Sequence, residues 1–179
     1  VYRKSFFADK KWQSKRIFIA FDGVNSVADI FINKKYISQH KGGYTRFVIE
    51  LTDRLKFGEE NLITVMASNV YRLDVLPLSG DFNVFGGMHR PVSIIITDKN
   101  CISPLDFGSS GVYISQEKIN EKEALLGIKT MISTSTKQAI QLKTSVFDAS
   151  YKLVKEIISN YAPNQILQKI TIPSPHLWD

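Results

Sequence analysis

The side chains best suited to binding a polar ligand gather in one stretch of the sequence, residues 76–92. Asp81 and Asn83 stand there on either side of Phe82, and Phe85 follows two residues later. A carboxylate and an amide make paired hydrogen bonds to neighbouring hydroxyl groups, while an aromatic ring packs against the apolar face of a sugar. Asp81 and Asn83 are therefore the candidate substrate-binding residues, with a carbohydrate as the ligand.

The same stretch also has a purely structural interpretation. Asp81 and Asn83 can cap turns, Phe82 and Phe85 can fill the core, and the glycine pair at 86–87 permits a tight bend. Spacing alone leaves both interpretations open.

The sequence offers no complete catalytic constellation. It contains no Gly-x-Ser-x-Gly elbow, no phosphate-binding loop and no His-Glu-x-x-His motif. Two carboxylates could hydrolyse a glycoside only from facing positions. We expect Glu59-Glu60 in a solvated turn, and Glu121 and Glu123 beside the start of a strand. We therefore predict no catalytic residue and no metal site in this chain.

Composition and charge restrict the partners. The chain has 179 residues and a formal net charge of +6, from 23 Lys and Arg against 17 Asp and Glu. The basic residues are scattered, which favours solvated strand edges over a nucleic-acid interface. No apolar run approaches the roughly 20 residues of a membrane-spanning helix, so we expect neither nucleic acid nor a membrane as partner. Cys101 is the single cysteine, which excludes an internal disulfide and leaves a His/Cys metal site short of ligands.

The two ends of the sequence suggest a piece of a longer protein. No initiator Met and no charged-then-apolar leader stand at Val1. At the other end, Trp178 follows a proline-rich exit, and it either folds back onto the second half or precedes further chain. The compartment stays open, with a periplasmic or extracellular location slightly favoured over a cytoplasmic one.

The sequence contains short apolar stretches separated by turns. We expect these stretches to form β-strands that position the candidate residues. Residues 17–21 are apolar on both faces, which is typical of a strand in the middle of a sandwich. Long loops in compact domains usually carry function, and 76–92 is such a connection. We expect further strands at 27–33, 36–40, 44–51 and 61–69, a hairpin turn at 33–35 and a helical turn at 53–58.

The pattern of residues along the sequence changes near Lys99. Longer alternating strands with few aromatic residues follow, at 124–134, 138–149, 151–159 and 166–172. This spacing resembles an immunoglobulin-like sandwich, without the Cys-Trp-Cys hallmark of antibody domains. The predicted fold is all-β: a jelly-roll-like (galactose-binding-domain-like) β-sandwich at 1–99, followed by an immunoglobulin-like β-sandwich at 100–179.

Several motifs in order resemble the N-terminal sugar-binding region of glycoside hydrolase family 2, the group of β-galactosidases, β-mannosidases and β-glucuronidases. The resemblance runs from end to end of the chain. The motifs that carry it are YRKSF (2–6), RIFIAFDGV (16–24), ADIFIN (28–33), HKGGYTRF (40–47), NLITV (61–65), DFN (81–83), GGMHRPV (86–92), Asp106 with Gly111-Val112, and PHLW (175–178).

The resemblance implies a parent enzyme in which a (β/α)₈ barrel follows the two sandwiches. That catalytic domain would be the main partner of this chain, and it carries the two glutamates of a retaining glycosidase. The loop bearing Asp81 would reach into the active site, where the aspartate binds the sugar directly or through a sodium ion, with a lesser role for Asn83. The resemblance implies no cofactor for this piece and a sodium or magnesium ion in the full-length enzyme. His40 also matches a family position, where we expect it to stabilise a turn.

The leading hypothesis is therefore a non-catalytic front part of a β-galactosidase-like hydrolase. It would pack on the barrel and contribute a loop that contacts the carbohydrate substrate, in a protein that could form a homo-oligomer. One alternative is a free-standing carbohydrate-binding module, and another is a structural or adhesion pair of β-sandwiches. A nucleic-acid binder ranks last.

Overall fold

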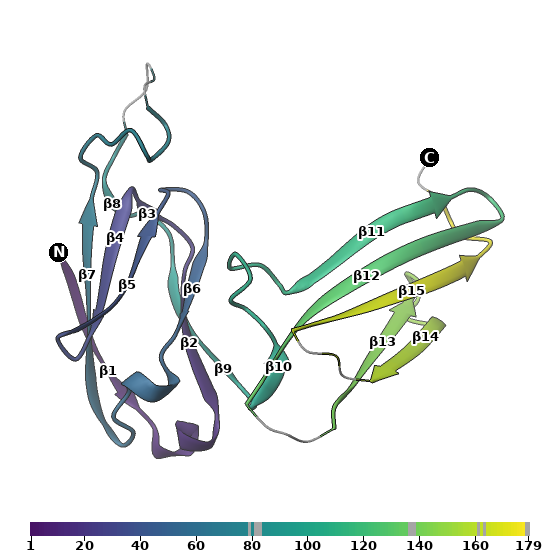
Figure 1. Cartoon of the computed structure of the whole chain (residues 1–179), viewed down its shortest axis with the longest axis horizontal. Helices are drawn as coiled ribbons and strands as arrows, with labels where there is room; N and C mark the ends of the chain where they lie inside the picture. Colours follow the sequence, from purple (N-terminus) through teal and green to yellow (C-terminus); the bar gives the residue numbers. More distant parts are fainter. Residues whose placement is uncertain (79, 81–83, 136–138, 161, 163, 178–179) are drawn as a thin grey trace. The chain divides into compact units, whose positions relative to one another are not determined.

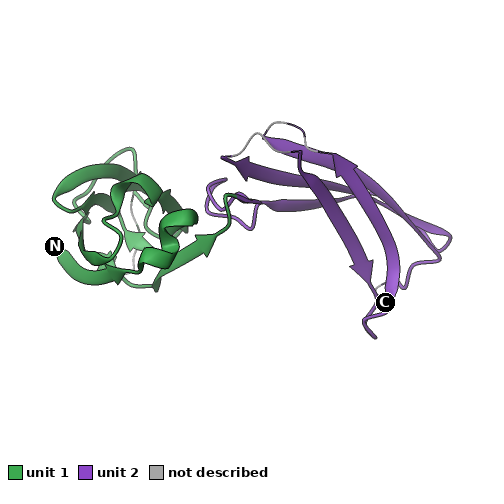
Figure 2. Cartoon of the chain, turned by 90° about the horizontal axis from the view of Figure 1, so that it is seen from below, with its two compact units in different colours: residues 1–99 green, residues 100–179 purple. Residues whose placement is uncertain are grey.

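The structure is a computed structural model that describes all residues except 79, 81–83, 136–138, 161, 163 and 178–179 (Figure 1). The chain divides into two compact units, 1–99 and 100–179, coloured separately in Figure 2. Strands form almost all regular structure in the described residues, together with two short 3₁₀ turns. None of the described residues form a helix that is long and apolar enough to cross a membrane. The predicted all-β fold class is confirmed.

The first unit packs two main antiparallel sheets face to face. The larger has the spatial order β1 (Tyr2–Ala8), β7 (Glu59–Ser68), β4 (Val27–Ile32) and β5 (Lys35–Lys41). The smaller has the order β6 (Phe47–Glu50), β2 (Arg16–Phe21) and β9 (Val92–Thr97). A short ribbon of β3 (Val24–Asn25) and β8 (Gly87–Met88) lies beside them, and the 3₁₀ turns are η1 (Lys10–Ser14) and η2 (Thr52–Arg54).

The core of the first unit follows from the alternation of apolar residues. Ile19 and Phe21 of β2 meet Ile30 of β4 and Val65 of β7 in one buried cluster. All six residues of β2 are buried, which explains why its sequence is apolar on both faces. The hairpin between β4 and β5 turns at Asn33 and Lys34, whose φ angles of 50° and 69° suit a tight two-residue turn.

The second unit is also built from antiparallel strands. Its larger sheet centres on β12 (Glu123–Thr134), which pairs with β10 (Asn100–Ile102), β11 (Val112–Ile119) and β15 (Gln165–Pro173). A second sheet joins β13 (Gln141–Phe147) to β14 (Leu153–Asn160).

A buried side chain links the two sheets of the second unit. Gln168 of β15 is 3% exposed. Its amide donates to Ser159 Oγ of β14 at 3.0 Å, and its carbonyl oxygen accepts from Thr144 Oγ1 of β13 at 2.7 Å. A buried amide is tolerated only where such bonds satisfy it, so Gln168 fixes how the sheets are paired.

Several predicted boundaries were wrong in detail. The helical turn is shorter and earlier than 53–58, at Thr52–Arg54. Glu59 and Glu60 are exposed as predicted, but they begin strand β7 rather than forming a turn. Residues 44–46 precede β6 instead of belonging to it.

Candidate functional site

The candidate loop connects β7 to β8 and projects from one end of the first unit (Figure 1). The two predicted sugar-binding residues, Asp81 and Asn83, lie outside the described residues, and so does Phe82. The structure describes the residues on either side of this segment.

Asn25, at the end of β3, anchors the far side of this loop. Its Nδ2 donates to the backbone oxygen of Phe85 at 2.7 Å. The pairing of β3 with β8 sets Asn25 opposite Gly87, so the loop returns to the scaffold at a fixed point. Asn69 is at the start of the loop, directly after β7, and its Nδ2 lies 3.5 Å from the backbone oxygen of Val84, near the end of the loop. The segment that contains Asp81 is therefore held at both ends.

Asn25 also has an unusual feature. The residue is 1% exposed, and its Oδ1 is a buried polar atom without a hydrogen-bond partner in the described structure. Gly43 lies against it, because a Cβ added at Gly43 would come within 2.1 Å of Oδ1. Asn25 is buried at the base of the candidate loop and retains an unused acceptor, which sequence analysis did not single out. The sequence signal that could have identified Asn25 was a polar residue within a largely apolar stretch.

An ion cluster ties the first part of the loop to the sheet. The Asp74 carboxylate accepts from Arg72 Nε at 2.9 Å and pairs with Lys41 of β5. These two hydrogen bonds, that of Arg72 first, hold the pKa of Asp74 well below its usual range. Asp74 is therefore charged at every physiological pH.

The base of the loop encloses a hollow of about 230 Å³, lined in part by Asn25, Tyr71, Val75 and Val84. The loop also exposes large apolar side chains: Phe85 and Leu73 are each 80% exposed. The part of the structural alternative that places Phe85 in the core is therefore wrong, while its parts that concern residues 81–83 lie outside the described residues.

His40, near this end of the first unit, packs against neighbouring side chains. The His40 ring stacks on Phe47, with centroids 4.0 Å apart, and its Nε2 lies 3.4 Å from Thr45 Oγ1. Burial lowers the pKa of His40, and a backbone hydrogen bond at Gly42 opposes that shift. These contacts fit the predicted turn-stabilising role.

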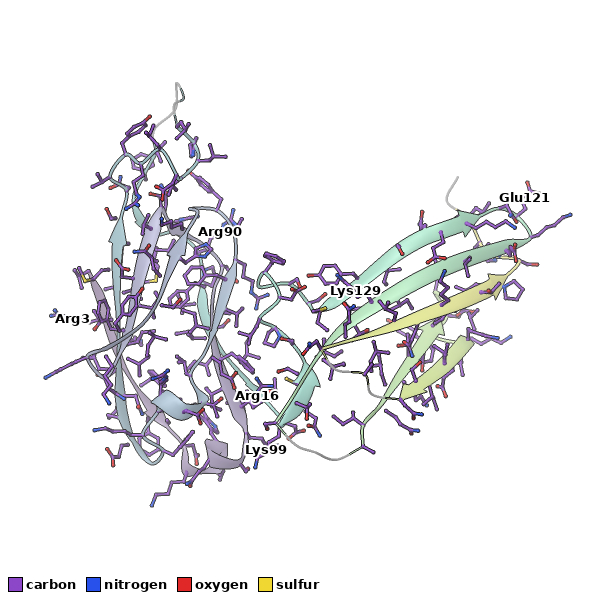
Figure 3. All side chains as sticks on the ribbon, viewed as in Figure 1. Arg3, Arg16, Arg90, Lys99, Glu121 and Lys129 are labelled. Atoms are coloured by element: carbon purple, nitrogen blue, oxygen red, sulfur yellow. The ribbon has the colours of Figure 1, made fainter. Side chains whose placement is uncertain are left out.

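His89 contributes to a second local cluster. Its ring lies 5.6 Å from that of Tyr44. Arg90, labelled in Figure 3, donates to the Tyr44 carbonyl at 2.9 Å. The loops on this end of the unit are thus cross-connected.

No metal centre is built by the residues that the structure describes, since none of their His, Cys, Asp and Glu side chains form a group of three or more. Asp81 lies outside the described residues, so a sodium site that includes it stays a prediction for the complete enzyme.

The chain matches known proteins along its whole length. The family profile described as "Glycosyl hydrolases family 2, sugar binding domain" matches residues 1–98. A β-glucuronidase of Bacteroides fragilis is 42% identical over 99% of this chain and 26% of its own length. A β-galactosidase of Thermoanaerobacter pseudethanolicus is 29% identical over 99% of this chain and 24% of its own length. The crystal structure of a Bacteroides uniformis β-glucuronidase superposes with a TM-score of 0.90 at 26% identity, covering 98% of this chain and 22% of that one.

The β-sandwich fold and these matches define a class of protein, those that contain a sugar-binding domain of the glycosyl hydrolase type. Within that class, the chain belongs to glycoside hydrolase family 2. It spans about a quarter of the length of the curated relatives it matches.

Proposed function

We propose that this chain is a non-catalytic part of a family 2 glycosidase that cleaves β-galactosides or β-glucuronides. The named relatives are β-glucuronidases and β-galactosidases, and sequence analysis found no catalytic pair of carboxylates. The chemistry would then be carried by a barrel domain elsewhere in the complete polypeptide, as the family resemblance implies.

The exposed apolar surface of the candidate loop carries the proposal. Val70 and Leu76 are 71% and 74% exposed, beside the still more exposed Leu73 and Phe85. A group of exposed large apolar side chains on one loop marks an interaction site. Because the loop base is fixed by Asn25 and Asp74, this surface is presented in a defined place, where it would pack on the barrel and bring Asp81 to the sugar.

Assays on p-nitrophenyl β-galactoside and β-glucuronide test this directly. We expect turnover by the complete polypeptide and none by residues 1–179 alone. Robust turnover by residues 1–179 would overturn the proposal. Calorimetric binding of a sugar panel by residues 1–179, with an inactive complete polypeptide, would favour the free-standing carbohydrate-binding module instead.

A further inference from the structure

The two long sides of the first β-sandwich differ. On one side the edges of β5 and β6 are joined by residues 42–46, and the stacked rings of His40 and Phe47 close the gap between the sheets. On the other side the edges are β1 and β9. Among the described strands, β1 pairs only with β7, and β9 pairs only with β2. In the described part of the chain, no loop joins the edges of β1 and β9 directly.

An apolar groove lies along this open side. Its volume is about 410 Å³, and it reaches the buried cores of β2 and β7 at Ile19, Phe21 and Val65. Phe6 of β1 and Ile94 of β9 form its two walls. One end lies beside a contact in which the Met88 amide donates to Tyr2 Oη at 3.3 Å.

The register shows that this open side of the sandwich exposes side chains on the core-facing side of β9. Val92 and Ile96 of β9 lie opposite Phe21 and Ile17 of β2. Alternate residues of a strand share a face, so Val92, Ile94 and Ile96 face the same side as the core residue Phe21. Val92 and Ile96 are nevertheless each 41% exposed. A sandwich with inward-facing aliphatic side chains this exposed lacks a covering element.

We propose that this groove accepts an extended segment of the complete polypeptide, from outside residues 1–179, which pairs with the free edge of β9. The inference rests on the proposed function, in which this chain is one part of a longer enzyme. Strand addition to an open edge satisfies the unpaired backbone groups. Six residues beside β9 would direct three side chains into the groove, because strand residues alternate.

The rest of the polypeptide is the occupant that fits best. The curated relatives are about four times as long as the part that this chain spans, so covalently attached chain is abundant and its effective concentration is high. A second copy would pair β9 with β9, and neither copy would then place a strand between the sheets of the other.

Lys4 indicates a further property of the segment that would occupy the groove. It lies on the inward face of β1, opposite Ile63 in register, and it lines the groove. A lysine in this position lays its aliphatic stem along apolar surface and keeps its ammonium group at the rim. We infer that the occupying segment alternates apolar residues and presents an acidic side chain to Lys4.

Residue-resolved amide exchange on the complete polypeptide tests this inference without any activity measurement. The β9 amides that point away from β2 should exchange at least tenfold more slowly than unprotected amides, at every protein concentration. Exchange at unprotected rates would overturn the proposal, even if the enzyme is fully active. Protection that appears only as protein concentration rises would assign the edge to a second copy and would also overturn it.

A pair of variants of the complete polypeptide provides the matched control. Val92→Asp places a charge in the groove, whereas Ser5→Asp places it on the exposed, outward face of β1, at a residue that does not line the groove. We expect Val92→Asp to lower Tm and to increase exchange along β9, with little effect from Ser5→Asp. Equal effects of the two variants would contradict a filled groove.

Discussion

The side chain of Asn25 and the main chain of Phe85, 60 residues apart in sequence, are joined by a hydrogen bond of 2.7 Å. This bond fixes the end of the loop that carries Asp81. Because Asn25 is packed under Gly43, the position of the loop depends on a turn far from it in sequence.

Gly43→Ala should therefore destabilise the first unit by about 1–3 kcal/mol, the usual cost of overpacking. The added methyl group must displace Asn25 and break its bond to Phe85. A double-mutant cycle with Asn25→Ala gives the decisive measurement in urea unfolding. We expect the double variant to be less destabilised than the sum of the single variants, and strict additivity would show that the two residues are not coupled.

Glu50 should make the stability of the first unit depend on acid pH. Arg16 donates to both its carboxylate oxygens, at 2.9 and 2.7 Å, and Thr52 adds a third bond. The Arg16 hydrogen bonds, and then Thr52, lower the pKa of Glu50 below its ordinary 4.5, against the opposing effect of burial. This stabilisation is present above the unfolded pKa and is lost as pH falls through the folded value.

Glu50→Gln should remove that part of the pH dependence and cost about 1–3 kcal/mol at neutral pH. Urea unfolding between pH 7 and pH 3 measures both effects. Parallel curves for the variant and the unaltered chain across this range would contradict the assignment.

His40 should contribute a second pH dependence, at higher pH. Burial lowers its folded pKa below the ordinary 6.5, so the unfolded chain takes up the proton first. Stability should then fall as pH drops below about 6.5. His40→Phe retains an aromatic ring to stack on Phe47, and we expect it to flatten the stability curve between pH 7 and pH 5.5. An unchanged slope would show that His40 does not titrate differently on folding.

Gln168→Leu should destabilise the second unit by about 1–3 kcal/mol, because it leaves Thr144 and Ser159 without their buried partner. Gln165→Leu, at an exposed position of the same strand, is the matched control and should change stability by less than about 0.5 kcal/mol. Amide exchange reports the stability of each of the two units separately in this experiment. Equal effects of the two substitutions would argue against a role for Gln168 in joining the sheets.

Much of the fold could be predicted from the sequence because strand alternation is a local signal. The apolar run of β2 and the turn at Asn33 and Lys34 were recognisable without coordinates. Boundaries were less accurate: Glu59 and Glu60 carry charges but belong to β7 and pair with Ala8 and Phe7 of β1, since an exposed strand end tolerates polar residues.

The candidate site was only partly predictable. Asp81 and Asn83 stood out by residue type, and they lie outside the described residues. Asn25 was missed because its importance comes from burial and from contacts with Gly43 and Phe85, which depend on tertiary packing. The open side of the sandwich could not be foreseen either, because the apolar residues of β9 have the same pattern whether or not a strand covers them.

In the proposed function, Asp81 completes the sugar site of a larger enzyme. The most direct test compares steady-state kinetics of the complete polypeptide carrying Asp81→Ala with those of Asp53→Ala, a substitution in the exposed η2 turn. We expect Asp81→Ala to lower kcat/KM on a nitrophenyl β-glycoside by roughly tenfold or more, a loss of about 1.4 kcal/mol in transition-state binding, while Asp53→Ala leaves it unchanged. Unaltered kinetics in the Asp81→Ala enzyme would contradict the claim.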